Sequence, residues 1–296
     1  MKLGIALSGG GIRGIAHAGV LKALEENNIK IDVMAGTSSG SLITVLYAMG
    51  FSPYYIYVLF KRYAKLIVGL ETKPIISGIS GFVANKKVGI SGLKTGQSLE
   101  ESFNEIALKK GFKNISDIKM PISIPAVDIR NSKEYIFTSK KFANKGMDKR
   151  YLNNISIGKA IRASSSFPGY FQPFKHKESL FLDGGLLNNV PVDEAKELGA
   201  DKVIAVKFVS DAVQEDSGMM DVVMRCIDIM GDRISENGLK MSDYILNVGT
   251  DKTGLFDVDK LDMCYKSGYD CTMKHIDEIK KIINWKIWYY MVLYKK

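Results

Sequence analysis

The sequence predicts an α/β fold in which helices connect the strands of a mainly parallel sheet. Near the start of the chain, two short apolar runs, Leu3–Leu7 and Ile31–Ala35, are each followed by a glycine-containing turn and a stretch with helical spacing. Two parallel strands need such a crossover, because the chain has to return to the end of the sheet at which the first strand began. Later, the apolar runs Leu180–Leu182 and Lys202–Phe208 flank the helical stretch Val192–Leu198. This alternation favours a parallel sheet with helical crossovers.

The rest of the chain adds elements of the same kinds. Residues 71–96 are rich in Gly, Ser and Lys, which is typical of a surface loop. No repeat, low-complexity tract or linker divides the chain, so we expect one domain over residues 1–296, with a helical or partly disordered tail over 261–296. The further helices expected are Ile12–Glu26, Leu42–Met49, Ser98–Lys110, Ser156–Ala163 and Met219–Met241, with a hairpin over Pro121–Thr138, irregular chain over Ser164–Pro173 and a strand over Tyr244–Val248.

The composition is that of an ordinary globular protein. The chain has 296 residues, of which 46% are hydrophobic and 25% are charged, and a chain of this length can bury a sizeable core. The start of the chain lacks the features of a signal peptide, and no apolar stretch reaches the roughly 18 residues of a membrane span. The three cysteines, Cys226, Cys264 and Cys271, show no C-x-x-C spacing and are expected to be reduced thiols. These features predict a cytoplasmic protein.

Ser38 lies in the stretch Gly36–Gly40, which reads GTSSG and fits the pattern G-x-S-x-G. In this pattern a serine occupies a sharp turn between a strand and a helix, and the small neighbours allow both the turn and the approach of a substrate. The start of the following helix favours a developing negative charge at the serine. The expected strand and helix are both present, so Ser38 is the candidate nucleophile. The alternative is a structural turn without a catalytic role.

A glycine-rich loop also separates the first strand from the first helix. Its unshielded N–H groups suit an oxyanion or a phosphate. The same residues fit G-x-G-x-x-G, the dinucleotide fingerprint, which needs an acidic residue at the end of the second strand. Asp32 lies at the start of that strand instead, and no Walker A lysine follows the glycines. An oxyanion hole is therefore the favoured interpretation. The loop consists of Gly9, Gly10, Gly11, Ile12, Arg13 and Gly14.

Asp183 is the candidate base, because it follows the strand Leu180–Leu182 and precedes Gly184 and Gly185. An aspartate at the carboxyl end of a strand could reach a serine at the end of a neighbouring strand. The alternative is a turn aspartate that binds its own backbone.

The histidines distinguish a Ser–Asp dyad from a Ser–His–Asp triad. The chain contains His17, His176 and His275, and none lies in a glycine-rich turn. The order Ser38, Asp183, His275 matches that of an α/β-hydrolase triad. However, His275 falls in a lysine-rich tail where a solvated position is expected, so the dyad is favoured and the triad remains the alternative.

The motifs GGGIRG, GTSSG and DGG, in this order, resemble the signature motifs of the patatin-like phospholipases. Gly36, Gly40, Gly184 and Gly185 belong to these motifs. The stretch ASSSFPGYFQP resembles a fourth conserved segment of that family, with matches at Ala163, Pro168, Phe171 and Pro173. The likeness extends from Met1 to about Phe208, and residues 209–296 carry no motif that places them.

The resemblance implies a three-layer α/β/α sandwich and a dyad of Ser38 and Asp183. It implies hydrolysis of lipid acyl esters, of the phospholipase A or lysophospholipase type, with no cofactor, no metal and no nucleotide. The substrate would be a phospholipid or another glycerolipid, and no nucleic acid is expected. The amides of Gly10, Gly11 and Ile12 are the best candidates for the oxyanion hole, while Arg13 adds a positive field, fixes the loop or is a surface charge. A carboxylate base requires a site that raises its proton affinity.

Two segments are candidates for peripheral membrane contact. The net charge of +9 is spread along the chain and permits attraction to anionic surfaces, although an ordinary basic protein would show the same balance. Tyr54–Ile67 and Ile282–Lys296 combine aromatic with basic residues, as lipid interfaces favour. The alternative for each is a helix packed on the sheet with one wet edge.

Overall fold

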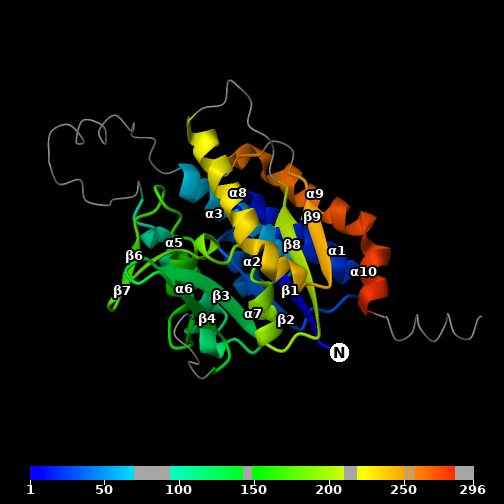
Figure 1. The fold of residues 1–296 in the computed structure, drawn as a ribbon, viewed down its shortest axis with the longest axis horizontal. Helices are drawn as coiled ribbons and strands as arrows, with labels where there is room; N and C mark the ends of the chain where they lie inside the picture. Colours follow the sequence, from blue (N-terminus) through cyan, green and yellow to red (C-terminus); the bar gives the residue numbers. More distant parts are fainter. Residues whose placement is uncertain (70–93, 143–148, 210–218, 251–252, 255–256, 284–296) are drawn as a thin grey trace, which may run out of the picture.

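The computed structural model describes residues 1–69, 94–142, 149–209, 219–250, 253–254 and 257–283. A central sheet has the strand order β5-β4-β3-β2-β1-β8-β9; β7 also pairs with β3, and β6 pairs with β7 (Figure 1). The strands are β1 (Leu3–Leu7), β2 (Val33–Gly36), β3 (Ile122–Asp128), β4 (Lys133–Thr138), β5 (Lys149–Leu152), β6 (Phe174–His176), β7 (Ser179–Asp183), β8 (Lys202–Phe208) and β9 (Tyr244–Val248).

Neighbouring strands from β3 through β2, β1 and β8 to β9 all pair in parallel. The predicted hairpin is present, because β3 and β4 pair antiparallel. The helices are α1 (Ala16–Glu26), α2 (Ser39–Ala48), α3 (Pro53–Gly69), α5 (Gln97–Lys109), α6 (Ile157–Ser164), α7 (Val192–Glu197), α8 (Met219–Lys240), α9 (Leu261–Lys274) and α10 (Ile276–Ile283). Short 3-10 turns cover Gly11–Ile15, Ile115–Asp117, Gly184–Leu186 and Val258–Lys260.

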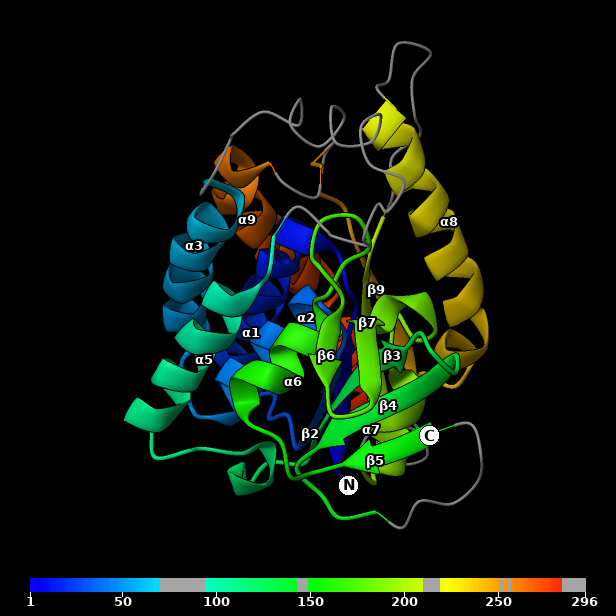
Figure 2. The ribbon, with the colours of Figure 1, turned by 90° about the vertical axis from the view of Figure 1, so that its left-hand side faces the viewer.

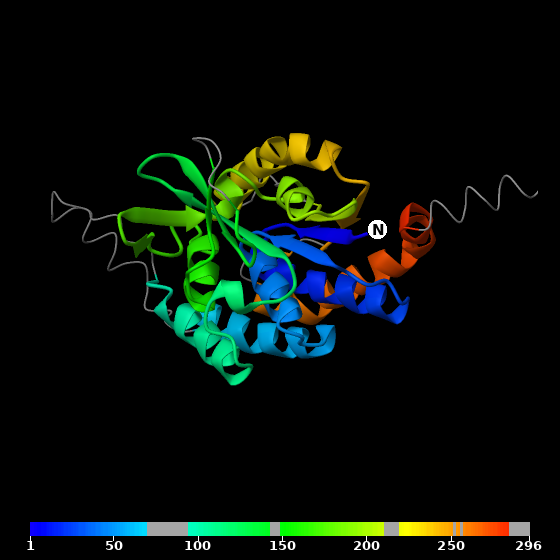
Figure 3. The ribbon, with the colours of Figure 1, turned by 90° about the horizontal axis from the view of Figure 1, so that it is seen from below.

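The helices form a layer on each face of the sheet (Figure 3). α7 and α8 lie on one face, and α1, α2, α3 and α9 lie on the other. The sequence of β1 shows why, since side chains alternate between the two faces of a strand. Ile5 and Leu7 join the larger core under α1 and α2, whereas Ala6 joins a smaller core with Val192 and Ala195 of α7. The three-layer α/β/α arrangement and the mainly parallel sheet are thereby confirmed.

Some details differ from the sequence-based expectation. The stretch predicted as one helix over Ile12–Glu26 begins with a 3-10 turn at Gly11–Ile15, because the glycine loop feeds directly into it. The strands β5 and β6 were not predicted, since β5 spans 4 residues and β6 spans 3 residues, too few to show an alternating pattern. None of the helices in the described part of the chain has the length and low charge of a membrane-spanning segment. The expected loop over residues 71–96 lies mostly, and the tail segment 284–296 entirely, outside the described residues.

Candidate active site

The sheet brings the ends of β2 and β7 together along one side of β3. Near the start of β3, Ser123 lies opposite Ala35 of β2, and three residues later Ala126 lies opposite Asp183 of β7. β2 runs parallel to β3 and β7 runs antiparallel, so their carboxyl ends point toward each other (Figure 2). The three residues from Ser123 to Ala126 span about 10 Å along β3. The chain that continues from Ala35 in the direction of β2 covers this distance and reaches Asp183, although the two are far apart in the sequence.

Ser38 occupies the sharp turn between β2 and α2. Its backbone has φ 52° and ψ −121°, a conformation that residues other than glycine rarely adopt. The Ser38 N–H donates to Oγ of Ser164 at 3.0 Å, and the Ser38 carbonyl accepts from Oγ of Ser41 at 2.6 Å. A methyl group at Gly40 would lie 2.4 Å from the carbonyl oxygen of Leu7, so only glycine allows α2 to approach β1 this closely. Packing around the turn thus holds the strained serine in place.

Asp183 is 4% exposed and lies at the end of β7. Its Oδ1 accepts the N–H of Gly185 at 2.8 Å, while Oδ2 is buried without a hydrogen-bond partner in the described chain. Burial raises the pKa of the Asp183 carboxyl to about 6, and the nearby Ser38 hydroxyl and the Gly185 N–H act in the opposite direction. Hydroxyl and carboxylate are therefore neighbours without a completed hydrogen bond. This carboxylate has the raised proton affinity that a base needs near neutral pH.

The glycine loop presents its N–H groups to the same pocket. The N–H of Gly9 donates to the carbonyl of Asn189 at 3.2 Å, and that of Arg13 donates to the carbonyl of Gly10, also at 3.2 Å. The N–H groups of Gly10, Gly11 and Ile12 have no acceptor within the described residues. Unpaired donors at the start of a helical turn form a site for negative charge.

Arg13 and Gly14 lie at the end of this loop and have other surroundings. Arg13 is 6% exposed and donates to the Gly10 carbonyl through Nε at 3.2 Å. Its Nη2 also bonds Oδ1 of Asp228 on α8 at 3.1 Å. A methyl group at Gly14 would lie 2.4 Å from Cβ of Ser39. Arg13 therefore joins the loop to α8 rather than serving as a surface charge, and Gly14 allows the loop to pack on α2.

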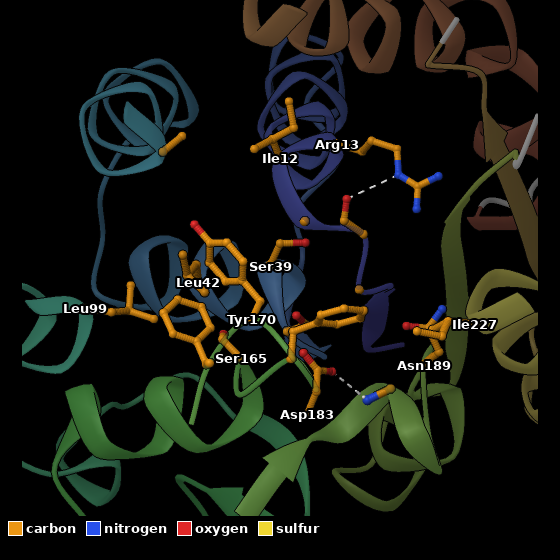
Figure 4. Close-up of a pocket in the computed structure, with 18 of the residues that line it drawn as sticks. Ile12, Arg13, Ser39, Leu42, Leu99, Ser165, Tyr170, Asp183, Asn189 and Ile227 are labelled. Atoms are coloured by element: carbon orange, nitrogen blue, oxygen red, sulfur yellow. Dashed lines mark hydrogen bonds between the residues drawn. The ribbon is translucent and has the colours of Figure 1, made fainter. Parts of the chain in front are cut away.

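A cavity of about 150 Å³ opens beside Ser38 and Asp183. In Figure 4, Leu42, Leu99 and Tyr170 lie to one side of Asp183, and Arg13, Asn189 and Ile227 lie to the other. The cavity is thus apolar where α2, α3 and α5 line it and more polar near the glycine loop and α8. Its lining includes, among others, Gly9, Gly10, Gly11, Ile12, Arg13, Ser38, Leu46, Phe60, Tyr63, Phe103, Phe167, Phe171, Asp183, Gly185 and Asp228. Gly14, Gly36, Gly40 and Gly184 do not line it, and they shape the turns from behind.

None of the three histidines lines this cavity. His17 is buried, its Nε2 lies 2.9 Å from the carbonyl oxygen of Ser8, and burial lowers its pKa to about 4. His275 lies beside Glu278, with 3.2 Å between Nδ1 and Oε2. His176 belongs to the short strand β6. The geometry therefore favours a Ser–Asp dyad over the alternative triad.

Asp32, the residue that a dinucleotide site would need, is also remote from the cavity. It precedes β2, whereas Ser38 follows the other end of that strand. Its Oδ2 accepts the N–H of Leu3 at 3.0 Å, and its Oδ1 lies 3.5 Å from Nζ of Lys30. Asp32 therefore stabilises the start of the sheet.

Three further residues of the site were not predicted, although Ser164 lies in the stretch ASSSFPGYFQP that resembles a segment of the family. Ser164 accepts the Ser38 N–H. Asn188 accepts a hydrogen bond from Oγ1 of Thr37 through its carbonyl at 2.7 Å, and Asn189 accepts the N–H of Gly9 in the same way. The two asparagines thereby join the nucleophile turn and the glycine loop to the chain that follows Asp183. The two asparagines follow the DGG motif after Leu186 and Leu187, and this short spacing is the feature of the sequence that could have drawn attention to them.

The described residues contain no group of three or more His, Cys, Asp or Glu side chains placed to hold a metal ion. Cys226, Cys264 and Cys271 are free cysteines, of which Cys226 is exposed and Cys264 is buried.

Comparison with known proteins identifies the family. The patatin-like phospholipase profile matches residues 5–196. Lysophospholipase NTE1 of Meyerozyma guilliermondii is 33% identical over 210 residues, covering 69% of this chain and 12% of that protein. Lysophospholipase NTE1 of Candida albicans is 28% identical over 317 aligned residues, covering 96% of this chain and 20% of that protein. Among solved structures, VipD from Legionella pneumophila matches 94% of this chain and 67% of that chain, with 17% identity and a TM-score of 0.49.

The chain thus spans only 12% to 20% of the length of these two curated relatives. Because the profile nevertheless covers more than half of the chain, from β1 to α7, this protein belongs to the patatin-like phospholipase family.

Proposed function

We propose that this chain forms one catalytic domain that hydrolyses acyl esters of lipids, with Ser38 as nucleophile and Asp183 as base. The observation that carries the proposal is the pairing of a buried carboxylate with a strained serine at an apolar cavity. Oδ2 of Asp183 has no hydrogen-bond partner in the described part of the chain, the Ser38 hydroxyl lies near this carboxyl, and the pKa of Asp183 is raised to about 6. Buried polar atoms normally have a hydrogen-bond partner, so an aspartate with only a structural role in the turn would be expected to have both oxygens hydrogen-bonded.

In the first half of the reaction, Asp183 takes the proton from Oγ of Ser38 as Oγ attacks the ester carbonyl carbon. The new Oγ–C bond forms a tetrahedral intermediate, and the negative charge moves to the former carbonyl oxygen. The N–H groups of Gly10, Gly11 and Ile12 are the donors for this oxyanion, because those of Gly9 and Arg13 are already bonded within the protein. When the bond to the alcohol breaks, the alcohol leaves with the proton held by Asp183.

In the second half, water attacks the acyl group on Ser38, and Asp183 accepts the proton of that water. Ser38 then leaves as the alkoxide, receives the proton and is regenerated as the hydroxyl, while the fatty acid is released. The apolar side of the cavity, with Leu42, Leu99 and Phe103, suits the acyl chain. The names of the curated relatives point to lysophospholipids, so we propose a phospholipid or a lysophospholipid as substrate.

A fluorophosphonate probe tests this proposal directly, because it reacts covalently with an activated serine. We expect a single adduct, located on Ser38 by mass mapping of the labelled protein. Labelling should weaken below about pH 6, where Asp183 becomes protonated. An adduct on Ser39, or no adduct in the folded protein, would contradict the assignment of the nucleophile.

We also propose peripheral contact with a lipid surface. Tyr54, Tyr55 and Val58 are exposed on α3, while Ile56 and Phe60 of the same helix are buried against the core. The helix is thus packed on one side and presents aromatic residues on the other. The second candidate segment of the sequence, Ile282–Lys296, lies almost entirely outside the described residues.

Vesicle binding tests this contact. With a net charge of +9, the protein should bind anionic vesicles more than neutral ones, and the binding should fall as salt shortens the screening length from about 10 Å at 0.1 M to about 3 Å at 1 M. The double variant Tyr54→Ser, Tyr55→Ser should bind less, whereas Leu108→Ser, an exposed residue on α5, serves as a matched control. If the unmodified protein, the double variant and Leu108→Ser bind vesicles equally, Tyr54 and Tyr55 do not contact the lipid surface.

A further inference from the structure

The carboxamide of Asn189 is a polar group of the cavity that the mechanism above does not use. The side chain is half-buried and lines the cavity. Its backbone is held, because its carbonyl accepts the Gly9 N–H at 3.2 Å, but its side chain makes no hydrogen bond within the described residues. Asn189 therefore offers one acceptor and two donors to whatever occupies this side of the cavity.

Three glycines surround this carboxamide and place it beside both residues of the dyad. A methyl group at Gly9 would lie 2.7 Å from Oδ1 of Asn189 and 3.2 Å from Cβ of Ser38. A methyl group at Gly185 would lie 3.1 Å from Oδ1 of Asn189 and equally far from Oδ1 of Asp183. On the side of α8, a methyl group at Gly231 would lie 3.4 Å from Nδ2 of Asn189. The absence of side chains at these positions keeps the carboxamide accessible.

The two sides of the cavity suit the two parts of an ester differently. Leu42, Leu99 and Tyr170 lie on the side away from Asn189 (Figure 4). The acyl chain gains most from this apolar side, because its CH2 groups leave water there. The alcohol part of the ester then points toward Asn189. Arg13 and Asp228, which also line this side, are bonded to each other, with 3.1 Å between Nη2 and Oδ1.

We propose that Asn189 is a specificity-determining residue that hydrogen-bonds a hydroxyl group on the alcohol part of the substrate, next to the scissile ester. A hydroxyl group donates one hydrogen bond and accepts others, and a carboxamide can match both roles at once. The substrate class is therefore an acyl ester of a polyol such as glycerol. This inference rests on the proposed function, since it assigns the leaving group of the same reaction.

Two esters of the same fatty acid test the inference. One is 1-monooctanoylglycerol, and the other is ethyl octanoate, which lacks hydroxyl groups. Asn189→Leu keeps the approximate size of the side chain and removes its hydrogen bonds, so the ratio of kcat/KM for the glycerol ester to that for the ethyl ester should fall about five- to tenfold. Asn189→Ala should shift the ratio in the same direction and serves if the leucine variant does not fold. Ile227→Ala, which changes the volume of the cavity on the side where Asn189 lies (Figure 4) without removing a polar group, should leave the ratio within about twofold of that of the unmodified protein.

A binding measurement separates this inference from the hydrolase proposal. In Ser38→Ala protein, 1-O-octylglycerol should bind about five- to tenfold more tightly than ethyl octyl ether, and a second change at Asn189 to Leu should abolish the difference. If Asn189→Leu alters neither the kinetic nor the binding ratio, the assignment is overturned. If the unmodified protein turns over neither ester but the binding difference and its loss are observed, the recognition of a hydroxyl group by Asn189 stands and the hydrolase proposal fails.

Discussion

Replacing Ser38 with alanine is expected to lower ester hydrolysis by at least about 10⁴-fold, with the fold intact. The variant removes the atom that forms the covalent bond to the acyl group, and loss of the nucleophile in Ser–His–Asp triads has effects of at least this size. Hydrolysis of a soluble octanoyl ester and reaction with the fluorophosphonate probe are the two measurements. Both should disappear together, while the melting temperature stays close to that of the unmodified protein.

Ser39→Ala is the matched control, because Ser39 also lines the cavity but begins α2 with a buried Oγ that has no hydrogen-bond partner in the described chain. It should retain far more activity than Ser38→Ala. Ser38→Gly adds a test of the strained turn, since glycine adopts φ 52° without the cost that a side chain brings. Ser38→Gly should be as inactive as Ser38→Ala. Its free energy of unfolding should exceed that of the unmodified protein by about 1 kcal/mol. Substantial hydrolysis by either Ser38 variant would contradict the proposed mechanism.

Replacing Asp183 with asparagine is expected to lower activity by about 10³- to 10⁴-fold, since an amide cannot accept the serine proton. In the unmodified protein, activity should rise with pH and reach half of its plateau near pH 6, where the pKa of Asp183 lies. The residual activity of Asp183→Asn should lack this dependence. A profile of log kcat against pH for both proteins measures the effect.

The same replacement should stabilise the folded protein at alkaline pH. Burial raises the pKa of Asp183 to about 6 in the folded state, against about 3.9 in an unfolded chain, so the folded state binds more protons between these values. Stability therefore falls as pH rises through this window, by on the order of 3 kcal/mol above pH 6. Asp183→Asn removes this cost, and its melting temperature should exceed that of the unmodified protein by more at pH 8 than at pH 5. An equal difference at both pH values would mean that Asp183 titrates as it would in solution.

Histidine variants separate the dyad from the triad. His275→Ala should retain most of the activity, because His275 contacts Glu278 and does not line the cavity. His17→Ala is a less clean control, since His17 is buried against Phe208 with 4.7 Å between the ring centroids, and its loss would disturb the first helix. A loss with His275→Ala as large as that with Asp183→Asn would restore the triad.

Much of the fold was predictable because it depends on local patterns. The apolar runs at Leu3–Leu7 and Lys202–Phe208 have the length of buried strands, and both lie in the parallel sheet. The turn at Gly36–Gly40 was predictable for the same reason, since small residues between a predicted strand and a predicted helix indicate a sharp turn. By contrast, the short strand β6 depends on pairing with β7 and shows too little of its own pattern to be found in the sequence.

By itself, the sequence determined the α/β class, the family resemblance and the two candidate residues, because these depend on motifs whose residue types and order are local properties. Only the tertiary structure decided how Ser38 and Asp183 meet. β2 pairs in parallel with the first part of β3, and β7 pairs antiparallel with the last part of the same side of β3. No local pattern in the sequence indicates this arrangement. The tertiary structure also decided which N–H groups of the glycine loop are free, because the carbonyl of Asn189, which is distant in the sequence, accepts the N–H of Gly9. The raised pKa of Asp183 likewise arises from burial, which depends on everything packed around the carboxylate rather than on its neighbours in sequence.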